Sequence, residues 1–169
     1  MDYPEFYENI SRPYRGRPHA IALLNVLDKG LVYFIAAAYI CCLAYLAWLA
    51  LQTGDTRIVR VLAVPAVGFV VCTVLRAALN QPRPYQRYAI DPLIHKDTNG
   101  KSMPSRHIFS ACIIACALLW MNPVLGIVGF VFCAIVAYCR IAGGVHFPRD
   151  VVCAVALALL IGVLGFWVI

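Results

Sequence analysis

The sequence predicts an all-α fold: a polytopic membrane helix bundle with about five transmembrane helices and an N-terminal interfacial helix. Composition is the first reason, because 63% of the 169 residues are hydrophobic and only 13% are charged, roughly half the charge of a soluble domain. The second is that the apolar residues gather in runs long enough to cross a bilayer about 30 Å thick. With a mean hydropathy of +0.81, the chain is neither a water-soluble globule nor disordered.

The N-terminal segment is predicted to lie at the membrane surface. Residues 1–18 are polar, proline-rich and aromatic, which is unlike the basic stub and apolar core of a cleavable signal peptide. Between His19 and Asp28, apolar residues recur on one side of a helix. This pattern favours a short helix lying in the interface.

The membrane-spanning segments follow in order along the chain. The predicted spans are Leu31–Leu51, Ile58–Asn80, Ser105–Met121, Pro123–Arg140 and Val151–Ile169. The third span is short, about 25 Å for some 17 residues. Asn122-Pro123 between the third and fourth spans is typical of a turn that joins two antiparallel helices. We see no internal repeat, so residues 1–169 are expected to form a single domain.

This order of spans places the polar segments on two sides of the membrane. The N-terminal segment, the linker Gln81–Pro104 and the turn Ile141–Arg149 share one side. Nearly all Lys and Arg residues are on that side, which predicts that it faces the cytoplasm. Some of these cations could instead bind anionic headgroups or a substrate, which would weaken this rule.

A first cluster of functional candidates closes the second span, where residues 76–84 read R-A-A-L-N-Q-P-R-P. An arginine inside a span costs about 2.5 kcal/mol or more, so Arg76 is a functional candidate by default. The alternative is that Arg76 only extends its guanidinium to the interface. Arg83 follows in the linker.

A second cluster, Pro104-Ser105-Arg106-His107, opens the third span. The free backbone N–H groups of a helix N-terminus favour an anion, and Ser105 and Arg106 add donors beside them. The alternative is that Ser105 is an ordinary helix cap and His107 a satisfied polar residue.

The third cluster joins the last two spans and contains Arg140, Gly143-Gly144, His146 and Asp150. A His and an Asp four residues apart can meet where the chain enters a helix. The carboxylate would then hold one imidazole nitrogen as N–H and leave the other free as a nucleophile or base. The alternative is a helix-start carboxylate beside an incidental histidine.

These clusters predict an anion site with no metal and no other cofactor. The expected neighbours of both histidines are arginines, which repel a cation and attract a phosphate.

Together the three clusters resemble the type 2 phosphatidic acid phosphatase family, membrane lipid phosphatases related to the vanadium haloperoxidases. The family pattern is Lys, six residues, Arg-Pro; then Pro-Ser-Gly-His; then Ser-Arg, five residues, His, three residues, Asp. The blocks match in order and spacing, and the motif-bearing core spans residues 56–169 behind a polar segment 1–30. Three positions depart from the pattern: Arg76 replaces lysine, Arg106 replaces glycine and Cys139 replaces serine.

The resemblance implies a metal-independent hydrolysis of a lipid phosphate or diphosphate in two steps. His146 would attack phosphorus and form a phosphohistidine while Asp150 orients its imidazole, and His107 would protonate the leaving oxygen and then activate water. Arg76, Arg83, Arg140 and Ser105 would bind the phosphate oxygens. As a further hypothesis, Arg106 contacts a second phosphate, which would favour isoprenoid diphosphates such as undecaprenyl diphosphate over monophosphates. Phosphatidic acid and phosphatidylglycerophosphate stay open as substrates.

Other functions and orientations stay open on the sequence alone. A non-catalytic protein that binds or transports lipid phosphate would use the same arginines, and a haloperoxidase would need vanadate. Bacterial relatives acting on undecaprenyl diphosphate face outward, against the cytoplasmic side that the basic residues predict. The expected partners are the lipid substrate and the bilayer, with no nucleic acid, and the oligomeric state is open.

Overall fold

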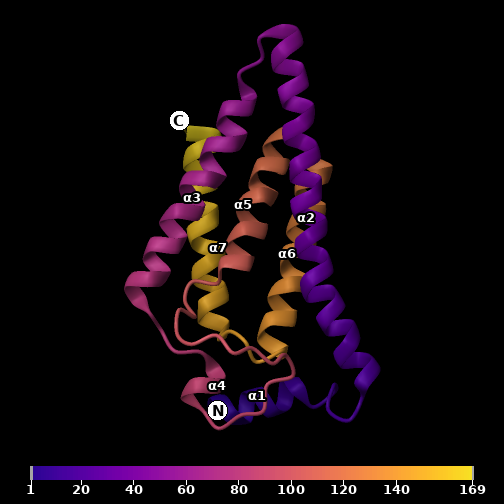
Figure 1. Cartoon of the computed structure of the whole chain (residues 1–169), viewed down its shortest axis with the longest axis vertical. Coiled ribbons are helices and arrows are strands. Elements are labelled where there is room, and N and C mark those ends of the chain that lie inside the picture. The colour runs from indigo at the N-terminus through magenta and orange to yellow at the C-terminus, as the bar shows by residue number, and fades with distance from the viewer. Residues whose placement is uncertain (1, 169) are drawn as a thin grey trace.

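The fold is an elongated helix bundle with two short helices across its lower end (Figure 1). The computed structural model describes residues 2–168, and this part of the chain contains no strand. The predicted all-α bundle is therefore confirmed. The elements in chain order are α1 (Tyr3–Ser11), α2 (Pro18–Thr53), α3 (Arg57–Leu79), α4 (Pro84–Arg87), α5 (Arg106–Met121), α6 (Pro123–Ala142), α7 (Pro148–Val163) and a π-helical turn (Leu164–Val168).

Helix α5 is the centre of the bundle. It packs against α2, α3, α6 and α7, and most of its side chains from Ile108 to Leu118 are buried. At 16 residues it is about 24 Å long, the short span that the sequence predicts. The four helices around it, with the π-helical turn continuing α7, are long and apolar enough to cross a membrane. Their outer surfaces expose large apolar side chains, as expected where the solvent is lipid.

The turn between α5 and α6 forms as predicted from Asn122-Pro123. The Asn122 side-chain oxygen accepts hydrogen bonds from the backbone N–H groups of Val124 at 2.9 Å and Leu125 at 3.2 Å. Pro123 occupies the first helical position, where its missing N–H has no partner to lose. The two helices therefore reverse direction with almost no loop.

The prediction of a separate interfacial helix at His19–Asp28 is wrong. Helix α2 runs without a break from Pro18 to Thr53, so this segment and the first predicted span are one helix. No proline interrupts the run, and Asp28, which looks like a boundary residue in the sequence, is only 1% exposed. The short N-terminal helix is α1, and it begins where the Asp2 side chain accepts a hydrogen bond from the Tyr3 N–H.

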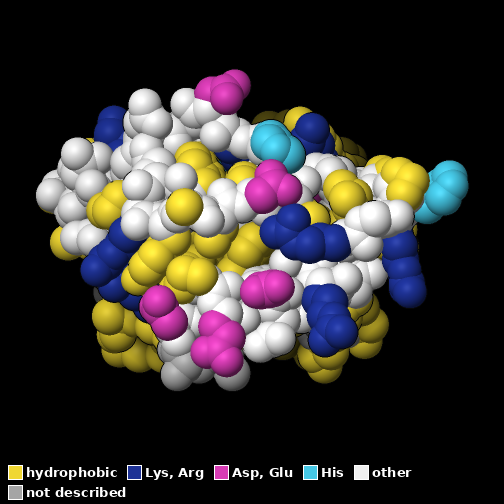
Figure 2. All heavy atoms as spheres, turned by 90° about the horizontal axis from the view of Figure 1, so that it is seen from below, with side chains coloured by type: hydrophobic (Ala, Val, Ile, Leu, Met, Phe, Trp, Pro, Cys, Tyr) yellow, Lys and Arg dark blue, Asp and Glu magenta, His cyan; other side chains and the backbone are white. Residues whose placement is uncertain are grey.

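The linker from residue 81 to 104 is mostly irregular and contains the single turn α4. Side chains of that turn hold the linker, because the Tyr85 hydroxyl donates to the Thr98 carbonyl and the Gln86 side-chain amide donates to Asn99, each at 2.7 Å. The Ile94 N–H donates to the Gly143 carbonyl at 3.1 Å and so ties the linker to the end of α6. Seen from below, this end carries charged side chains of both signs among polar atoms, with apolar flanks (Figure 2).

Candidate active site

The three clusters predicted from the sequence meet at the lower end of the bundle. The Arg76 Nη1 donates to the Pro104 carbonyl at 2.9 Å, which joins the first cluster to the second. The Arg83 Nη1 donates to the Val145 carbonyl at 3.3 Å, beside His146 of the third cluster. The backbone N–H of Ser105 donates to the Asp150 carbonyl at 3.2 Å, which joins the second cluster to the third. Segments far apart in the sequence therefore build one site.

His146 and Asp150 lie side by side, but a third side chain links them. The His146 Nδ1 is 3.6 Å from the Asp150 Oδ2, too long for a good hydrogen bond. The Ser102 hydroxyl oxygen is 2.5 Å from that carboxylate oxygen and 3.3 Å from the imidazole Nδ1. The backbone N–H of Phe147 also donates to the Asp150 Oδ2, at 3.0 Å.

Ser102 is a residue of the site that the sequence analysis missed. It lies in the irregular linker, where no periodicity distinguishes one polar residue from the next. Its side chain is fully buried, and burial of a serine in a linker is a property that only the folded chain reveals. Its place two residues before Pro104 is the one local signal.

Burial keeps His146 neutral. The side chain is 1% exposed, and burial lowers its pKa to about 4, with the Arg83 and Arg140 cations adding to the shift and the Asp150 carboxylate opposing it. The imidazole therefore carries no charge at pH 7. A neutral imidazole with its Nδ1 side directed at Ser102 and Asp150 keeps a lone pair on Nε2, as a nucleophile requires.

Arg140 is paired with an acidic residue that the sequence analysis also missed. Its Nε lies 2.5 Å from the Asp28 Oδ1 of α2, and both side chains are almost fully buried. The contact uses Nε, so the terminal nitrogens of the guanidinium keep donors for an anion. Lys96 of the linker adds charge nearby: burial, followed by the Arg140 cation, lowers its pKa to about 8.

His107 and Arg106 face a different environment, since both are exposed at the start of α5. They line a cavity of about 290 Å³ together with Val32 of α2, Phe69 of α3 and Ser110.

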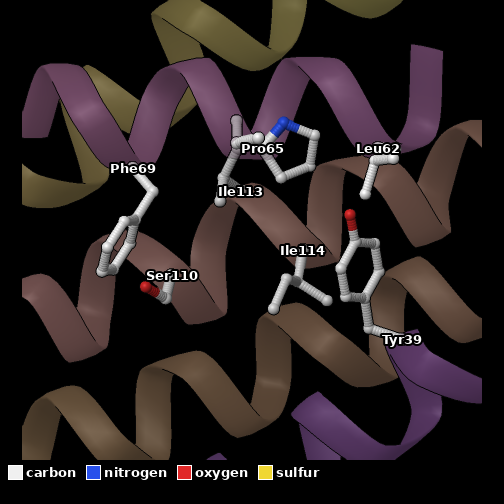
Figure 3. Close-up of a pocket in the computed structure, with 8 residues that line it drawn as sticks. Tyr39, Leu62, Pro65, Phe69, Ser110, Ile113 and Ile114 are labelled. Atoms are coloured by element: carbon white, nitrogen blue, oxygen red, sulfur yellow. The ribbon is translucent and has the colours of Figure 1, made fainter. Parts of the chain in front are cut away.

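A second cavity of about 270 Å³ shares Phe69 and Ser110 with the first and extends it toward the upper end of the bundle. Figure 3 shows Tyr39, Leu62 and Pro65 of α2 and α3 around Ile113 and Ile114 of α5. We call the two cavities the α2–α3 groove. The groove is apolar along its length and polar where it reaches His107.

The charged groups of the site suit an anion. Within residues 2–168, no group of three or more His, Cys, Asp or Glu side chains is placed to hold a metal ion. Most of the cations near the two histidines are guanidinium groups, which match the geometry of phosphate oxygens, and Lys96 adds an ammonium group.

A membrane bundle that combines two histidines, an aspartate and buried arginines at one end has the groups needed to bind a phosphate beside an imidazole. The family model described as the PAP2 superfamily matches residues 57–169. This match spans more than half of the chain and includes all three clusters. The chain therefore belongs to the PAP2 superfamily.

Individual relatives resemble the chain over most of its length. It is 29% identical over 145 residues to the undecaprenyl-diphosphatase BcrC of Bacillus subtilis (strain 168), covering 84% of this chain and 75% of that protein. The crystal structure of Aquifex aeolicus LpxE matches 95% of this chain and 92% of its own, with a TM-score of 0.71 and 21% identity. The crystal structure of the first transmembrane PAP2 type phosphatidylglycerolphosphate phosphatase from Bacillus subtilis matches 95% and 83%, with a TM-score of 0.68 and 22% identity.

Proposed function

We propose that this chain is an integral membrane lipid phosphatase that hydrolyses a phosphomonoester or diphosphate of a membrane lipid, without a metal, through a phosphohistidine intermediate. One observation carries the proposal: the buried His146 is linked through Ser102 to Asp150 and lies near the Arg83 and Arg140 cations. Family membership and the named activities of the relatives support the same reaction class.

The reaction takes place in two phosphoryl transfers. In the first, the His146 Nε2 forms a bond to phosphorus as the bond to the leaving oxygen breaks, and His107 gives a proton to that oxygen. In the second, His107 takes a proton from water, the water oxygen bonds to phosphorus, and the bond to Nε2 breaks. The arginines and Ser105 bind the nonbridging oxygens and stabilise the charge that develops on them.

The hydrocarbon chain of the substrate lies in the α2–α3 groove. A lipid phosphate needs a polar site for its head and an apolar path for its tail, and the groove leads from His107 into apolar surroundings. Undecaprenyl diphosphate, phosphatidic acid and phosphatidylglycerophosphate all fit this description. The similarity to the undecaprenyl-diphosphatase BcrC favours undecaprenyl diphosphate among them.

Arg106 is proposed to contact a second phosphate and so to favour diphosphates. It stands beside His107 at the polar end of the groove, where the head of a diphosphate would extend. We expect Arg106→Gly to lower the ratio of diphosphate to monophosphate hydrolysis by about tenfold, because a charge-assisted contact contributes about 1.5 kcal/mol or more. An unchanged ratio would reject this role.

The domain organisation follows from the same proposal. Residues 1–169 act as one membrane-embedded unit in which residues 56–169 carry the motifs and residues 1–30 contribute to the lower end of the bundle. Tyr3 of α1 supports this, because its ring packs against Phe147, next to His146, with ring centroids 4.6 Å apart.

The test is phosphate release by purified protein in detergent with excess chelator, on the three lipids named above. We expect wild type and His95→Ala to release phosphate and His146→Ala to release none, since His95 is an exposed histidine of the linker. Radiolabelled diphosphate should leave acid-labile, alkali-stable label on wild-type protein.

Normal release by His146→Ala would overturn the mechanism. If folded wild type binds lipid phosphate and releases none, the function is the alternative one, binding or transport of lipid phosphate. If phosphate release stops when the chelator is added, the reaction needs a metal ion and the metal-free mechanism is wrong.

A further inference from the structure

The backbone of Ser102 is held in place by contacts with two other segments of the site. Its backbone N–H donates to the Gln81 carbonyl at 2.8 Å, and its carbonyl lies 3.4 Å from the Arg76 Nη1. These contacts fix the linker against the end of α3. The hydroxyl, which is fully buried, therefore has a defined position between His146 and Asp150.

The chemistry of the three groups gives these contacts a direction. An ionised carboxylate only accepts hydrogen bonds, so the 2.5 Å contact places the serine proton toward Asp150. The oxygen of Ser102 then has only lone pairs to offer at the 3.3 Å contact, and the imidazole Nδ1 must be the donor there. The proton of a neutral His146 consequently lies on Nδ1, and the lone pair lies on Nε2.

We propose that Ser102 is a positioning residue: its hydroxyl bridges the Asp150 carboxylate and the His146 imidazole and so fixes the tautomer of the nucleophile. This inference rests on the proposed function and adds to it, because the direct His146 to Asp150 contact that the sequence predicts is 3.6 Å long. Ser102 exchanges no proton with the substrate. Its role is the orientation of a ring that reacts at the opposite nitrogen.

The experiment compares Ser102→Ala and Ser102→Thr with wild type. We expect Ser102→Ala to lower kcat by about 10–100-fold with little change in KM, since loss of an orienting partner typically costs that much. Ser102→Thr retains a hydroxyl and should recover part of the loss. Ser11→Ala is the matched control, because Ser11 is also fully buried and hydrogen bonded but lies on α1.

A second measurement separates positioning from a general loss of structure. The chain has only four histidines, so ¹⁵N NMR of histidine-labelled protein in detergent can report the His146 tautomer, with His146→Gln identifying its signals. We expect Nδ1 to be protonated in wild type and the two tautomers to mix in Ser102→Ala. This measurement does not depend on turnover, so it remains decisive if wild type proves to have no phosphatase activity.

An unchanged His146 tautomer in Ser102→Ala would overturn the inference, whatever happens to the activity. An unchanged kcat would overturn it as well. A loss of activity without a change of tautomer would mean that the serine contributes only to packing of the linker.

Discussion

The buried ion pair between Arg140 and Asp28 shows how a single residue makes this site compatible with its surroundings. A guanidinium placed in the bundle loses its hydration, and a carboxylate from α2 compensates for that loss. The pair is 3% and 1% exposed. Such a pair is costly to break by removing one partner, because the other charge then stays buried alone.

We therefore expect Asp28→Asn to lower the free energy of unfolding by about 3–5 kcal/mol. The matched control is Asp55→Asn, which breaks the Asp55 pair with Arg57 at the opposite end of the bundle. Water can reach the Asp55 carboxylate and its partner Arg57. The control should therefore change the free energy of unfolding little. Thermal unfolding in detergent measures both, and equal losses would contradict a buried, compensating role for Asp28.

The pKa of His146 predicts a dependence of stability on pH. Burial lowers this pKa to about 4, whereas an unfolded histidine titrates near 6.5. Between these two values the unfolded chain binds the proton and the folded chain does not, so the free energy of unfolding decreases as the pH falls. The contribution of the neutral His146 to the free energy of unfolding is fully present above about pH 6.5 and can reach about 3 kcal/mol.

Comparison with His146→Gln isolates that contribution. The wild type should lose more stability than the variant between pH 7 and pH 4.5, because glutamine does not titrate and the remaining groups contribute to both proteins. Parallel stability curves for the two proteins over this range would mean that His146 is solvated in the folded state.

At the scale of elements, helices α2 and α3 are joined by a hydrogen bond that a proline makes necessary. Pro65 lies inside α3 and has no N–H to donate to the Val61 carbonyl one turn earlier. The Tyr39 hydroxyl of α2 donates to that carbonyl at 2.7 Å. In lipid no water is available for a free carbonyl, so the tyrosine replaces the missing donor.

A double-mutant cycle tests this interpretation. We expect Tyr39→Phe to cost about 1 kcal/mol in the wild type, and less in a Pro65→Ala background, where residue 65 regains the N–H. Unfolding of the four proteins in detergent gives the coupling free energy directly. Tyr33→Phe is the control, since Tyr33 lies on the same helix and is 74% exposed. Equal costs of Tyr39→Phe in both backgrounds would refute the explanation.

The elements themselves were largely predictable because lipid imposes a strong constraint on composition. Apolar runs that carry charge only near their ends predict α3, α5 and α6 to within about two residues, and the π-helical turn Leu164–Val168 completes the last predicted span. The sequence does not predict the start of α2, since Asp28 resembles a boundary residue until its partner Arg140 on α6 is known. Secondary structure is local, whereas the pairing of Asp28 with Arg140 depends on tertiary packing.

The same distinction applies to the site. Its three clusters could be read from the sequence because their residues stand at the ends of apolar spans and match the family pattern in order and spacing. Ser102 could not, because it lies in an irregular linker whose path depends on contacts such as Ile94 to Gly143. The departures Arg76 and Cys139 occupy buried positions of the bundle, and Arg106 opens onto the α2–α3 groove.

For the whole molecule, charge is distributed unequally between the two ends. All Lys and Arg residues except Arg57 and Arg60 lie in the half of the chain's structure that holds the site. Five of these cations, Arg76, Arg83, Lys96, Arg106 and Arg140, lie in or near the site. The remaining ones still outnumber the two at the upper end, so the positive-inside rule predicts that the site faces the cytoplasm.

This orientation can be tested with reporters fused to the two ends of the chain, which lie at opposite ends of the bundle (Figure 1). If the site faces the cytoplasm, a C-terminal alkaline phosphatase in a bacterial host should be active, because that enzyme folds only outside the cytoplasm. A C-terminal green fluorescent protein should then be dark, and the N-terminal fusions should give the reverse pattern. The opposite result would place the site outside and assign the excess cations to anionic lipid headgroups. Under the proposed function, the answer decides which leaflet supplies the lipid phosphate, since the α2–α3 groove is polar at the end where it reaches His107.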